Sequence, residues 1–153
     1  MSTLLVQSCS KTKIEADSPV SALDLYSGYF FKIIKKSTRE RGEKLELDLC
    51  ILSAEHGIID PDEPISPYDR QMDQIRAEEL SSEVKKDLKR RIADKRYDRI
   101  VINAGKEYRR AIDGFDDDIN VETYFIRGEG IGEKGQALKQ FLQGEDSVIV
   151  EEN

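Results

Sequence analysis

The segment Leu4-Leu5-Val6-Gln7-Ser8, which runs on into Cys9-Ser10-Lys11, decides the fold of this chain. A short apolar run that ends in small polar residues is typical of a strand buried in a parallel sheet. Comparable runs predict further strands at residues 45–52, 99–103 and 121–126. Helical segments separate these strands, and such alternation predicts an α/β domain with right-handed crossovers.

A helix is expected after the first strand, beginning at Ser18-Pro19, because proline is tolerated in the first turn of a helix. Its apolar residues recur at helical spacing and predict one buried face: Ala22, Leu25, Tyr26, Tyr29, Phe30, Ile33 and Ile34. Gly28 lies inside this helix, where glycine costs ~1 kcal/mol, and it therefore indicates close approach by a backbone or a ligand. A second helix is expected to bury Ile75, Leu80, Val84, Leu88 and Ile92. Shorter helices are expected at residues 108–112 and 134–142.

These elements predict one domain over residues 1–153, built as three layers with helices on both faces of the sheet. The expected sheet is mainly parallel and has four strands in the order 2-1-3-4, numbered along the chain. Its topological switch lies between the first and third strands, and ligands bind beyond the carboxyl ends of the strands near such a switch. Residues 143–153 are expected to form an acidic tail or to add an edge strand at residues 148–150.

The composition excludes several classes of protein. With 24 Lys and Arg against 31 Asp and Glu, the net charge of −7 argues against a general, salt-driven nucleic-acid coat protein. Local basic patches remain compatible with it. No run approaches the ~20 apolar residues of a membrane span, the N-terminus lacks the basic region of a signal peptide, and two cysteines form no disulfide framework. We therefore expect a cytoplasmic protein with no membrane partner.

Polar side chains follow each expected strand. In chain order they are Ser8, Cys9, Ser10, Lys11 and Lys13; then Ser53, Glu55 and His56; then Asn103, Lys106 and Tyr108; then Arg127. Because parallel strands deliver their carboxyl ends to one edge, we expect the segments 9–13 and 53–68 to line one cleft. Tyr26, Ser27 and Gly28 are expected to serve this cleft as well as the core.

Several chemistries are open at this edge. Cys9 and His56 form a nucleophile pair in one interpretation, and in the other they are a packed thiol and a loop histidine. A metal site needs three or four ligands, which one His and two Cys do not supply, so no metal or cofactor is expected. The turn Gly128–Gly132 is similar to a phosphate cradle, but without the spacing of nucleotide-binding motifs it is equally a flexible turn and helix cap.

Four segments occur together in a known family: Cys9-Ser10-Lys11-Thr12-Lys13, Leu25-Tyr26-Ser27-Gly28-Tyr29-Phe30-Phe31, Ser53-Ala54-Glu55-His56-Gly57-Ile58-Ile59-Asp60-Pro61 and Ile65-Ser66-Pro67-Tyr68-Asp69. Over residues 5–72 the chain resembles a small domain of bacteria, archaea and phages that is similar to YaaA, the peroxide-stress protein.

The alternation of strands and helices also resembles that of uracil-DNA glycosylases, whose catalytic loops follow strand ends. A glycosylase-like relative in enzymes that modify tRNA and DNA with 7-deazaguanines has a Cys-Ser-x-x-Lys-like segment after a strand, similar to Cys9–Lys13. The chain departs from the glycosylases because no Gly-Gln-Asp-Pro-Tyr loop follows its first strand and no His-Pro-Ser loop follows its fourth. The resemblance thus implies a fold and a nucleic-acid-related activity, but not activity on uracil.

The resemblance implies a glycosylase-like enzyme, a hydrolase or transglycosylase, that acts on the N-glycosidic bond of a base in DNA or RNA. Such an enzyme needs a pocket for an extruded base, a group to read the base and cations for phosphates. The catalytic candidates are Cys9, His56, Asp60 and Asp69, of which the two aspartates position water and His56 supports the leaving group. The binding candidates are Asn103 to read a base edge, Tyr26 or Tyr68 to stack on it, Lys11, Lys13 and Arg127 for phosphates, and Ser10, Ser27 and Ser53 along the cleft.

Two alternatives stay open. The first is a non-catalytic module of stress response or defence that binds DNA or a nucleotide in the same cleft. The second is a purely structural interaction domain.

Overall fold

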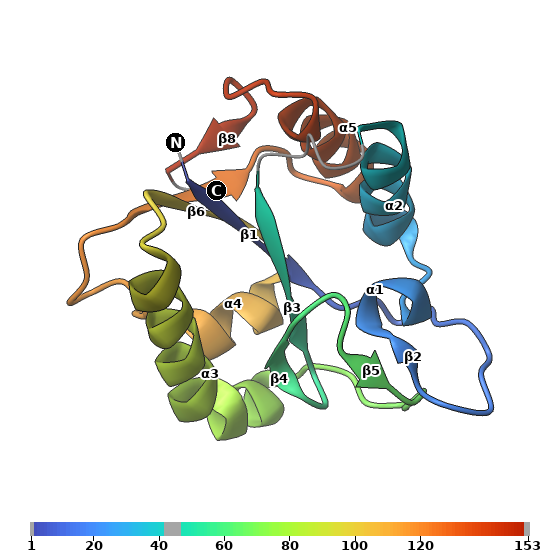
Figure 1. Ribbon diagram of the computed structural model, residues 1–153. Helices are drawn as coiled ribbons and strands as arrows, with labels where there is room; N and C mark the ends of the chain where they lie inside the picture. The colour runs from blue at the N-terminus through green and yellow to red at the C-terminus, as the bar shows by residue number, and fades with distance from the viewer. Residues whose placement is uncertain (1, 42–46, 152–153) are drawn as a thin grey trace.

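Strands and helices alternate along the chain in the computed structural model, which describes residues 2–41 and 47–151 (Figure 1). The strands are β1 (Thr3–Ser8), β2 (Val20–Ser21), β3 (Asp48–Ser53), β4 (Gly57–Ile59), β5 (Pro64–Ile65), β6 (Arg99–Asn103), β7 (Glu122–Ile126) and β8 (Ile149–Val150). The helices are α1 (Ala22–Leu25), α2 (Tyr29–Arg41), α3 (Gln74–Lys95), α4 (Lys106–Ile112) and α5 (Ile131–Leu142).

The main sheet has six strands, in the order β4-β3-β1-β6-β7-β8, rather than the expected four. Its inner strands β3, β1, β6 and β7 run parallel, whereas β4 and β8 pair antiparallel at the two edges. β4 was missed because the turn after Ser53 resembles a loop, and Gly57, at φ +74, returns the chain alongside β3. A separate two-stranded sheet joins β2 and β5.

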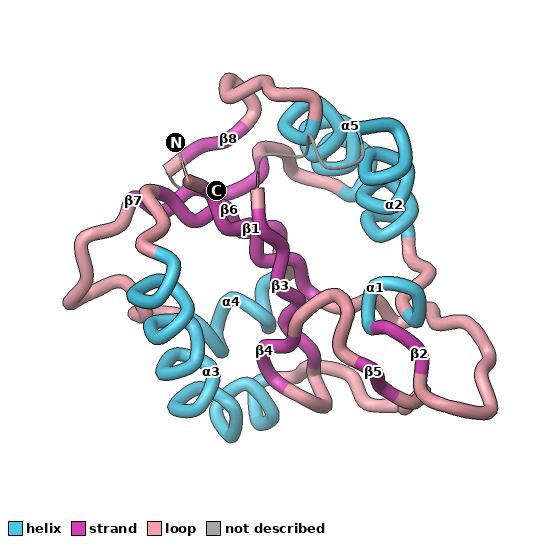
Figure 2. The backbone as a smooth tube through the Cα atoms, viewed as in Figure 1, coloured by secondary structure: helices cyan, strands magenta, loops and turns pink. Residues whose placement is uncertain are grey.

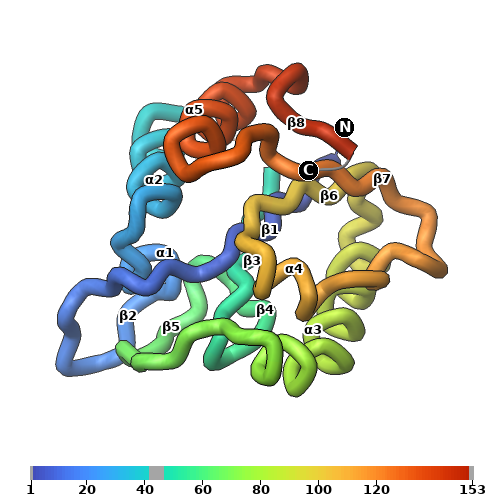
Figure 3. The backbone as a smooth tube through the Cα atoms, turned by 180° about the vertical axis from the view of Figure 1, so that it is seen from behind, coloured from blue at the N-terminus to red at the C-terminus, as the bar shows by residue number. Residues whose placement is uncertain are grey.

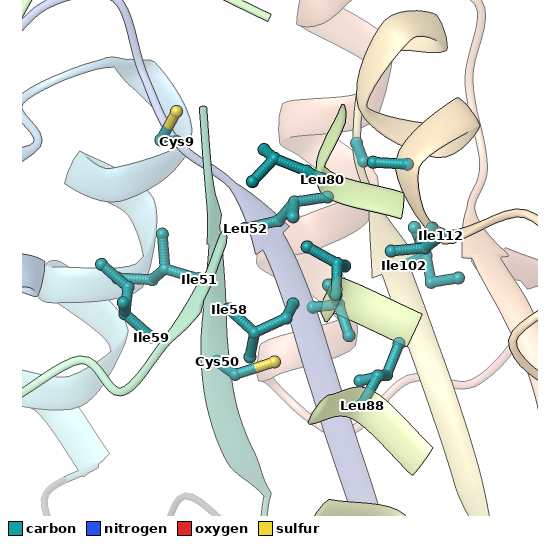
Figure 4. Packing of buried hydrophobic residues seen from close by; sticks show 14 of the residues in the cluster. Cys9, Cys50, Ile51, Leu52, Ile58, Ile59, Leu80, Leu88, Ile102 and Ile112 are labelled. Carbon is teal, nitrogen blue, oxygen red and sulfur yellow. The ribbon is translucent and has the colours of Figure 1, made fainter. Parts of the chain in front are cut away.

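Helices cover both faces of the main sheet: α2 and α5 lie on one face, and α3 and α4 lie on the other (Figure 2). The side chains of β1 alternate between two buried clusters. Leu4 and Val6 belong to the cluster that α3 closes, and Leu5 belongs to the one that α5 closes. Figure 4 shows Cys50 and Leu52 of β3 on the side of the sheet where α3 lies. The apolar runs of the strands are buried on both faces, as a covered parallel sheet requires.

The first predicted helix is wrong, because the structure divides it into two helices, α1 and α2. α1 ends at Leu25, and Tyr26 adopts extended backbone angles (φ −77, ψ 123) that a helix does not allow. A bridge between Tyr26 and Lys13 holds this break, and α2 begins at Tyr29. The buried face therefore changes phase, so that Tyr29 is 49 % exposed and Phe31 is buried. Local periodicity did not reveal the break because Lys13 holds it from outside the helix.

The second long helix, α3, buries Leu80, Val84, Leu88 and Ile92 as expected. Ile75 is wrongly placed on that face, since it is 71 % exposed in the first turn, and Ala77 is buried instead. The remaining boundaries differ by a few residues: α4 and α5 begin earlier than predicted, and residues 45 and 46 of the second expected strand lie outside the described residues. Among the described residues, no helix has the length and apolar character needed to cross a membrane.

Gly28 is required by a close contact. A Cβ at this position would lie 2.5 Å from Cβ of Ser10, in the segment that follows β1. We expect Gly28→Ala to lower the free energy of unfolding by about 1–3 kcal/mol, because the backbone must shift to admit the methyl group. Urea denaturation measures this change.

Gly132→Ala is the matched control, because a Cβ at Gly132, in the first turn of α5, meets nothing within 4 Å. It should leave stability unchanged or raise it slightly, since alanine has the higher helix propensity. Equal stability of the Gly28→Ala variant and the wild type would contradict the requirement.

A second prediction concerns alkaline pH. Burial raises the pKa of the Cys50 thiol to about 12, whereas a thiol in an unfolded chain titrates near ~8.5. Between these values the unfolded state binds fewer protons than the folded state. The free energy of unfolding is therefore expected to fall above about pH 9, by up to ~1.4 kcal/mol per pH unit from this group.

Urea denaturation at a series of pH values measures the slope. Cys50→Ala should flatten it between about pH 9 and pH 10. Above that range Tyr26, whose pKa burial also raises to about 12, adds a fall of the same sign in both proteins. If the free energy of unfolding falls with the same slope in the variant and the wild type between about pH 9 and pH 10, Cys50 does not contribute to the pH dependence.

Candidate functional site

A cavity of about 330 Å³ opens at the carboxyl ends of β1 and β6. β3 pairs with one side of β1. The chain then crosses the sheet and places β6 on the other side of β1 (Figure 3). The cavity is lined by Ser8, Cys9 and Ser10 after β1, by Tyr29, Phe30 and Phe31 of α2, by Asn103, Ala104, Gly105 and Tyr108 at the start of α4, and by Ile131 and Lys134 of α5. It therefore occupies the place where doubly wound sheets bind ligands.

Cys9 lies at the wall of this cavity and contacts a tyrosine. Its Sγ is 3.0 Å from the hydroxyl oxygen of Tyr108, and either group is able to donate the hydrogen bond. The side chain of Cys9 is 9 % exposed. The structure thus pairs Cys9 with Tyr108 and not with His56, which is exposed and lies with its ring edge-on to Tyr68.

Three further hydroxyl groups, those of Tyr26, Ser53 and Tyr68, form a cluster behind Cys9, which we call the hydroxyl cluster. The Tyr26 and Tyr68 oxygens are 2.6 Å apart, and Ser53 Oγ lies 3.3 Å from Tyr26 and 2.9 Å from Tyr68. Ser53 Oγ also accepts hydrogen bonds from the backbone N–H groups of Glu55 and His56. The cluster therefore joins the end of β3 to α1 and to the segment before α3.

The tyrosines around Cys9 stay protonated at neutral pH. Burial, and next the nearby sulfur of Cys9, raises the pKa of Tyr26 to about 12. The same two causes raise the pKa of Tyr68 and of Tyr108 further above its ordinary value. Each phenol thus keeps its O–H at pH 7: Tyr26 donates to Ser53, and Tyr108 shares a hydrogen bond with the Cys9 sulfur.

Asn103 is 3 % exposed and lines the cavity with its amide held in one orientation. The carbonyl oxygen of Ser8 accepts a hydrogen bond from Gln7 Nε2, so Gln7 Oε1 is left to accept one from Asn103 Nδ2, at 2.9 Å. Asn103 therefore presents its amide at the cavity in a fixed orientation, with one N–H bonded to Gln7.

The segment after β1 is held against the start of α2. Ser10 Oγ accepts a hydrogen bond from the backbone N–H of Gly28 and donates one to the carbonyl oxygen of Thr12. Lys13 Nζ donates to the carbonyl oxygen of Lys11 and lies over the Tyr68 ring, 4.4 Å from its centroid. Lys13 therefore covers the hydroxyl cluster, while Lys11 is exposed beside it.

Other predicted site residues lie apart from the cavity. Asp60 follows β4, which runs back toward the amino ends of the parallel strands, and its carboxylate is 2.6 Å from Arg91 of α3. Asp69 and Arg127 are exposed. Ser27 is half-buried between α1 and α2, where its N–H donates to Thr12. Tyr26 is fully buried against Phe31, so its ring is not available for stacking on a base.

The wider hollows carry less of the predicted chemistry, and those of about 530 Å³ and 360 Å³ along α3 include none of the predicted site residues. One of about 620 Å³ lies between α4 and β7 and includes none of the predicted site residues. Another of about 740 Å³, near the amino ends of the strands, includes Asp60 alone among them. Within the described residues, no group of three His, Cys, Asp or Glu side chains is arranged to hold a metal ion. We therefore take the cavity at Cys9 as the candidate site.

Sequence reasoning did not predict Gln7, Phe30, Tyr108 or Lys134 as site residues, although it placed Phe30 on the buried helix face and Tyr108 after the third strand. Tyr108 carried a usable signal, because it follows Asn103 by five residues at the start of the next helix. Lys134 was assigned only to the last helix, and its position at the cavity follows from α5 beginning at Ile131. Gln7 was counted as part of a strand, although a buried amide in an apolar run requires a partner.

The two cysteines should differ in reactivity. Cys9 lines a cavity beside a phenol, whereas Cys50 is fully buried and its pKa is raised to about 12. We expect iodoacetamide to modify Cys9 of the native protein at least about tenfold faster than Cys50, because access and thiolate character control the reaction. Peptide mass spectrometry measures both rates in one sample. Equal rates, or modification only after unfolding, would show that Cys9 is as inaccessible as Cys50.

Comparison with solved structures finds the crystal structure of AF0587, a protein of unknown function. The two chains share 16 % sequence identity with a TM-score of 0.56, and the match covers 94 % of this chain and 45 % of that one. This chain thus spans less than half the length of that protein, and the likeness is one of fold. No curated protein matches the sequence. A family model matches residues 4–140, and the chain belongs to that family, a family of unknown function (DUF6884).

Proposed function

We propose that the cavity at Cys9 binds a nucleobase of DNA, RNA or a nucleotide, and that the protein acts on the N-glycosidic bond of that base. The observation that carries this proposal is the convergence of a buried amide, a Cys–Tyr pair and aromatic rings on one cavity of about 330 Å³. Cavities of ~300 Å³ and above are of the size that holds small ligands. The similarity of residues 5–72 to YaaA-like domains, and of the strand–helix alternation to uracil-DNA glycosylases, supports the proposal by analogy.

Recognition of the base is assigned to Asn103. Its carbonyl oxygen and its second N–H match the adjacent donor and acceptor on the Watson–Crick edge of an extruded base. Because Gln7 holds the amide, little side-chain entropy remains to be lost on binding. Phe30 and Tyr29, at the start of α2, supply aromatic surface at the same cavity in place of the buried Tyr26.

Contact with a phosphate is assigned to Lys134. This lysine lies in the first turns of α5, whose N-cap residue, Gly130, has no side chain to accept hydrogen bonds from the helix N–H groups. The N-terminus of a helix attracts anions, and a lysine beside it adds a full charge. Lys11 and Lys13 lie on the segment that leaves the same cavity and extend the positive charge along a strand of nucleic acid.

Binding tests the first half of the proposal. The probe is a short, fluorescently labelled single-stranded DNA of mixed sequence, with its RNA counterpart, measured by anisotropy across salt concentrations. Asn103→Ala should weaken binding by about 1–3 kcal/mol, the cost of a lost bidentate contact. Lys134→Ala should reduce the slope of log affinity against log salt by about 0.7, the value for one phosphate of a single strand.

Lys139→Ala is the matched control, since Lys139 is exposed in the last turn of the same helix. It should change neither the affinity nor the slope. If Lys134→Ala and Lys139→Ala behave alike, the phosphate does not lie at the start of α5. If neither nucleic acid binds, the proposed function is wrong.

The second half of the proposal, action on the N-glycosidic bond, is tested by measuring the release of free base. Chromatography of the same oligonucleotides after incubation should detect base lost from the strand with the wild type and not with Cys9→Ala. Tight binding by a protein that releases no base would favour the alternative, a non-catalytic binding module of stress response or defence.

A further inference from the structure

Gln7 is a buried amide at the end of the apolar run of β1. Its side chain is 1 % exposed. Because side chains alternate along a strand, it lies on the same face of the sheet as Leu5, the face that α2 and α5 cover. Burying an amide costs free energy unless hydrogen bonds compensate, whereas an apolar side chain of the same size carries no such cost. The reason for a glutamine at this position therefore lies in the groups to which it bonds.

The hydrogen bonds of Gln7 fix the amide of Asn103. The two residues are direct neighbours in the parallel pairing of β1 with β6. Gln7 Nε2 donates to the carbonyl oxygen of Ser8 at 3.1 Å, and Gln7 Oε1 accepts from Asn103 Nδ2 at 2.9 Å. A carbonyl oxygen only accepts, so the nitrogen of Gln7 must face Ser8 and its oxygen must face Asn103. Asn103 in turn must present its nitrogen to Gln7.

This contact prevents the Asn103 amide from turning over. The last side-chain torsion of asparagine is soft and nearly two-fold, so an amide without a partner exchanges its oxygen and nitrogen by half a turn. Beside Gln7, that half turn would place Asn103 Oδ1 against Gln7 Oε1, two acceptors with no proton between them. The lost hydrogen bond opposes the turned state. Asn103 lines the cavity and therefore presents its donor and acceptor in one order only.

We propose that Gln7 is a positioning residue that decides which class of nucleobase the cavity accepts. This inference rests on the proposed function, because it assumes that a base binds against Asn103. Adenine and cytosine present an exocyclic amino donor beside a ring-nitrogen acceptor, whereas guanine and uracil present an exocyclic oxygen acceptor beside a ring N–H donor. An amide held in one order pairs with one of these two classes, and the turned amide pairs with the other.

The experiment compares two ligands that differ in this order. Fluorescently labelled single-stranded oligomers of deoxycytidine and of deoxyuridine, equal in length, are bound to the full chain and measured by anisotropy. The two bases have nearly the same size and the two strands carry the same phosphates, so the ratio of the two affinities reports the contact with the base edge. We expect the wild type to bind one oligomer about tenfold more tightly than the other, as a good bidentate contact does.

Gln7→Met removes both hydrogen-bonding groups at nearly unchanged volume. Asn103 then adopts both orientations, and the ratio of affinities should fall to within about twofold of one. Gln7→Glu should keep the wild-type ratio, because a carboxyl oxygen at this position still accepts from Asn103 Nδ2. Gln7→Leu replaces Gln7→Met if the methionine variant does not fold.

Thr3→Val is the matched control on the same strand. Thr3 is 4 % exposed, and its hydroxyl accepts a hydrogen bond from Arg99 at the other end of β1 and β6. Thr3→Val thus removes a buried polar contact without touching Asn103, and the ratio should stay as in the wild type. A loss of stability by itself lowers both affinities equally and leaves the ratio unchanged.

A double-mutant cycle tests whether Gln7 acts through Asn103. In the Asn103→Ala background the ratio should already be close to one, and adding Gln7→Met should change neither affinity by more than about twofold. If Gln7→Met weakens binding as much in that background as in the wild type, Gln7 acts on another part of the protein and the inference is wrong.

The outcomes separate this inference from the proposed function. Equal binding of the two oligomers by the wild type, or a ratio that persists in Gln7→Met, would overturn the role of Gln7 while leaving base binding in the cavity intact. A ratio that falls equally in Gln7→Met and Thr3→Val would also overturn it. If the wild type binds neither oligomer nor their RNA counterparts, the proposed function is wrong, and the role of Gln7 with it.

Discussion

The parallel pairing of β1 with β3 on one side and with β6 on the other is the constraint on which the rest of the structure depends. Parallel neighbours require crossovers, and right-handed crossovers that run in opposite directions across the sheet, from β1 to β3 and from β3 past β1 to β6, place their helices on opposite faces. α2 therefore covers one face and α3 the other, and each closes its own buried cluster. Where the segments after β1 and β6 part, the cavity opens.

Two contacts turn this opening into a site. The close approach of Ser10 to Gly28 holds the segment after β1 against the start of α2, so that Cys9 stays at the wall of the cavity. The hydroxyl cluster then ties the end of β3 to Tyr26 and Tyr68 behind the sulfur. Buried hydroxyl groups that satisfy one another reinforce a single arrangement, because breaking any one bond leaves a buried polar group without a partner.

The sequence was most informative where a structural feature is local. Apolar runs located the four inner strands, and helical spacing located the buried face of α3 from Leu80 to Ile92. Gly28 was singled out by the cost of glycine inside a helix; the structure places it between α1 and α2 instead, and the close approach of Ser10 is the reason for a glycine there. The break at Tyr26 and the hairpin that forms β4 were missed, because Lys13 holds the first and pairing with β3 holds the second.

The sequence by itself determined the four inner strands, the long helix α3 and the polar residues placed just beyond the strand ends, because hydrophobic periodicity and turn residues act over a few positions. Only the tertiary structure decided which of those residues meet. Cys9 contacts Tyr108, 99 residues away, because β1 and β6 are neighbours in the sheet. Asp60, only seven residues after Ser53, lies near the opposite edge because β4 reverses direction. The pairing and direction of strands set these distances, and neither property is encoded in local spacing.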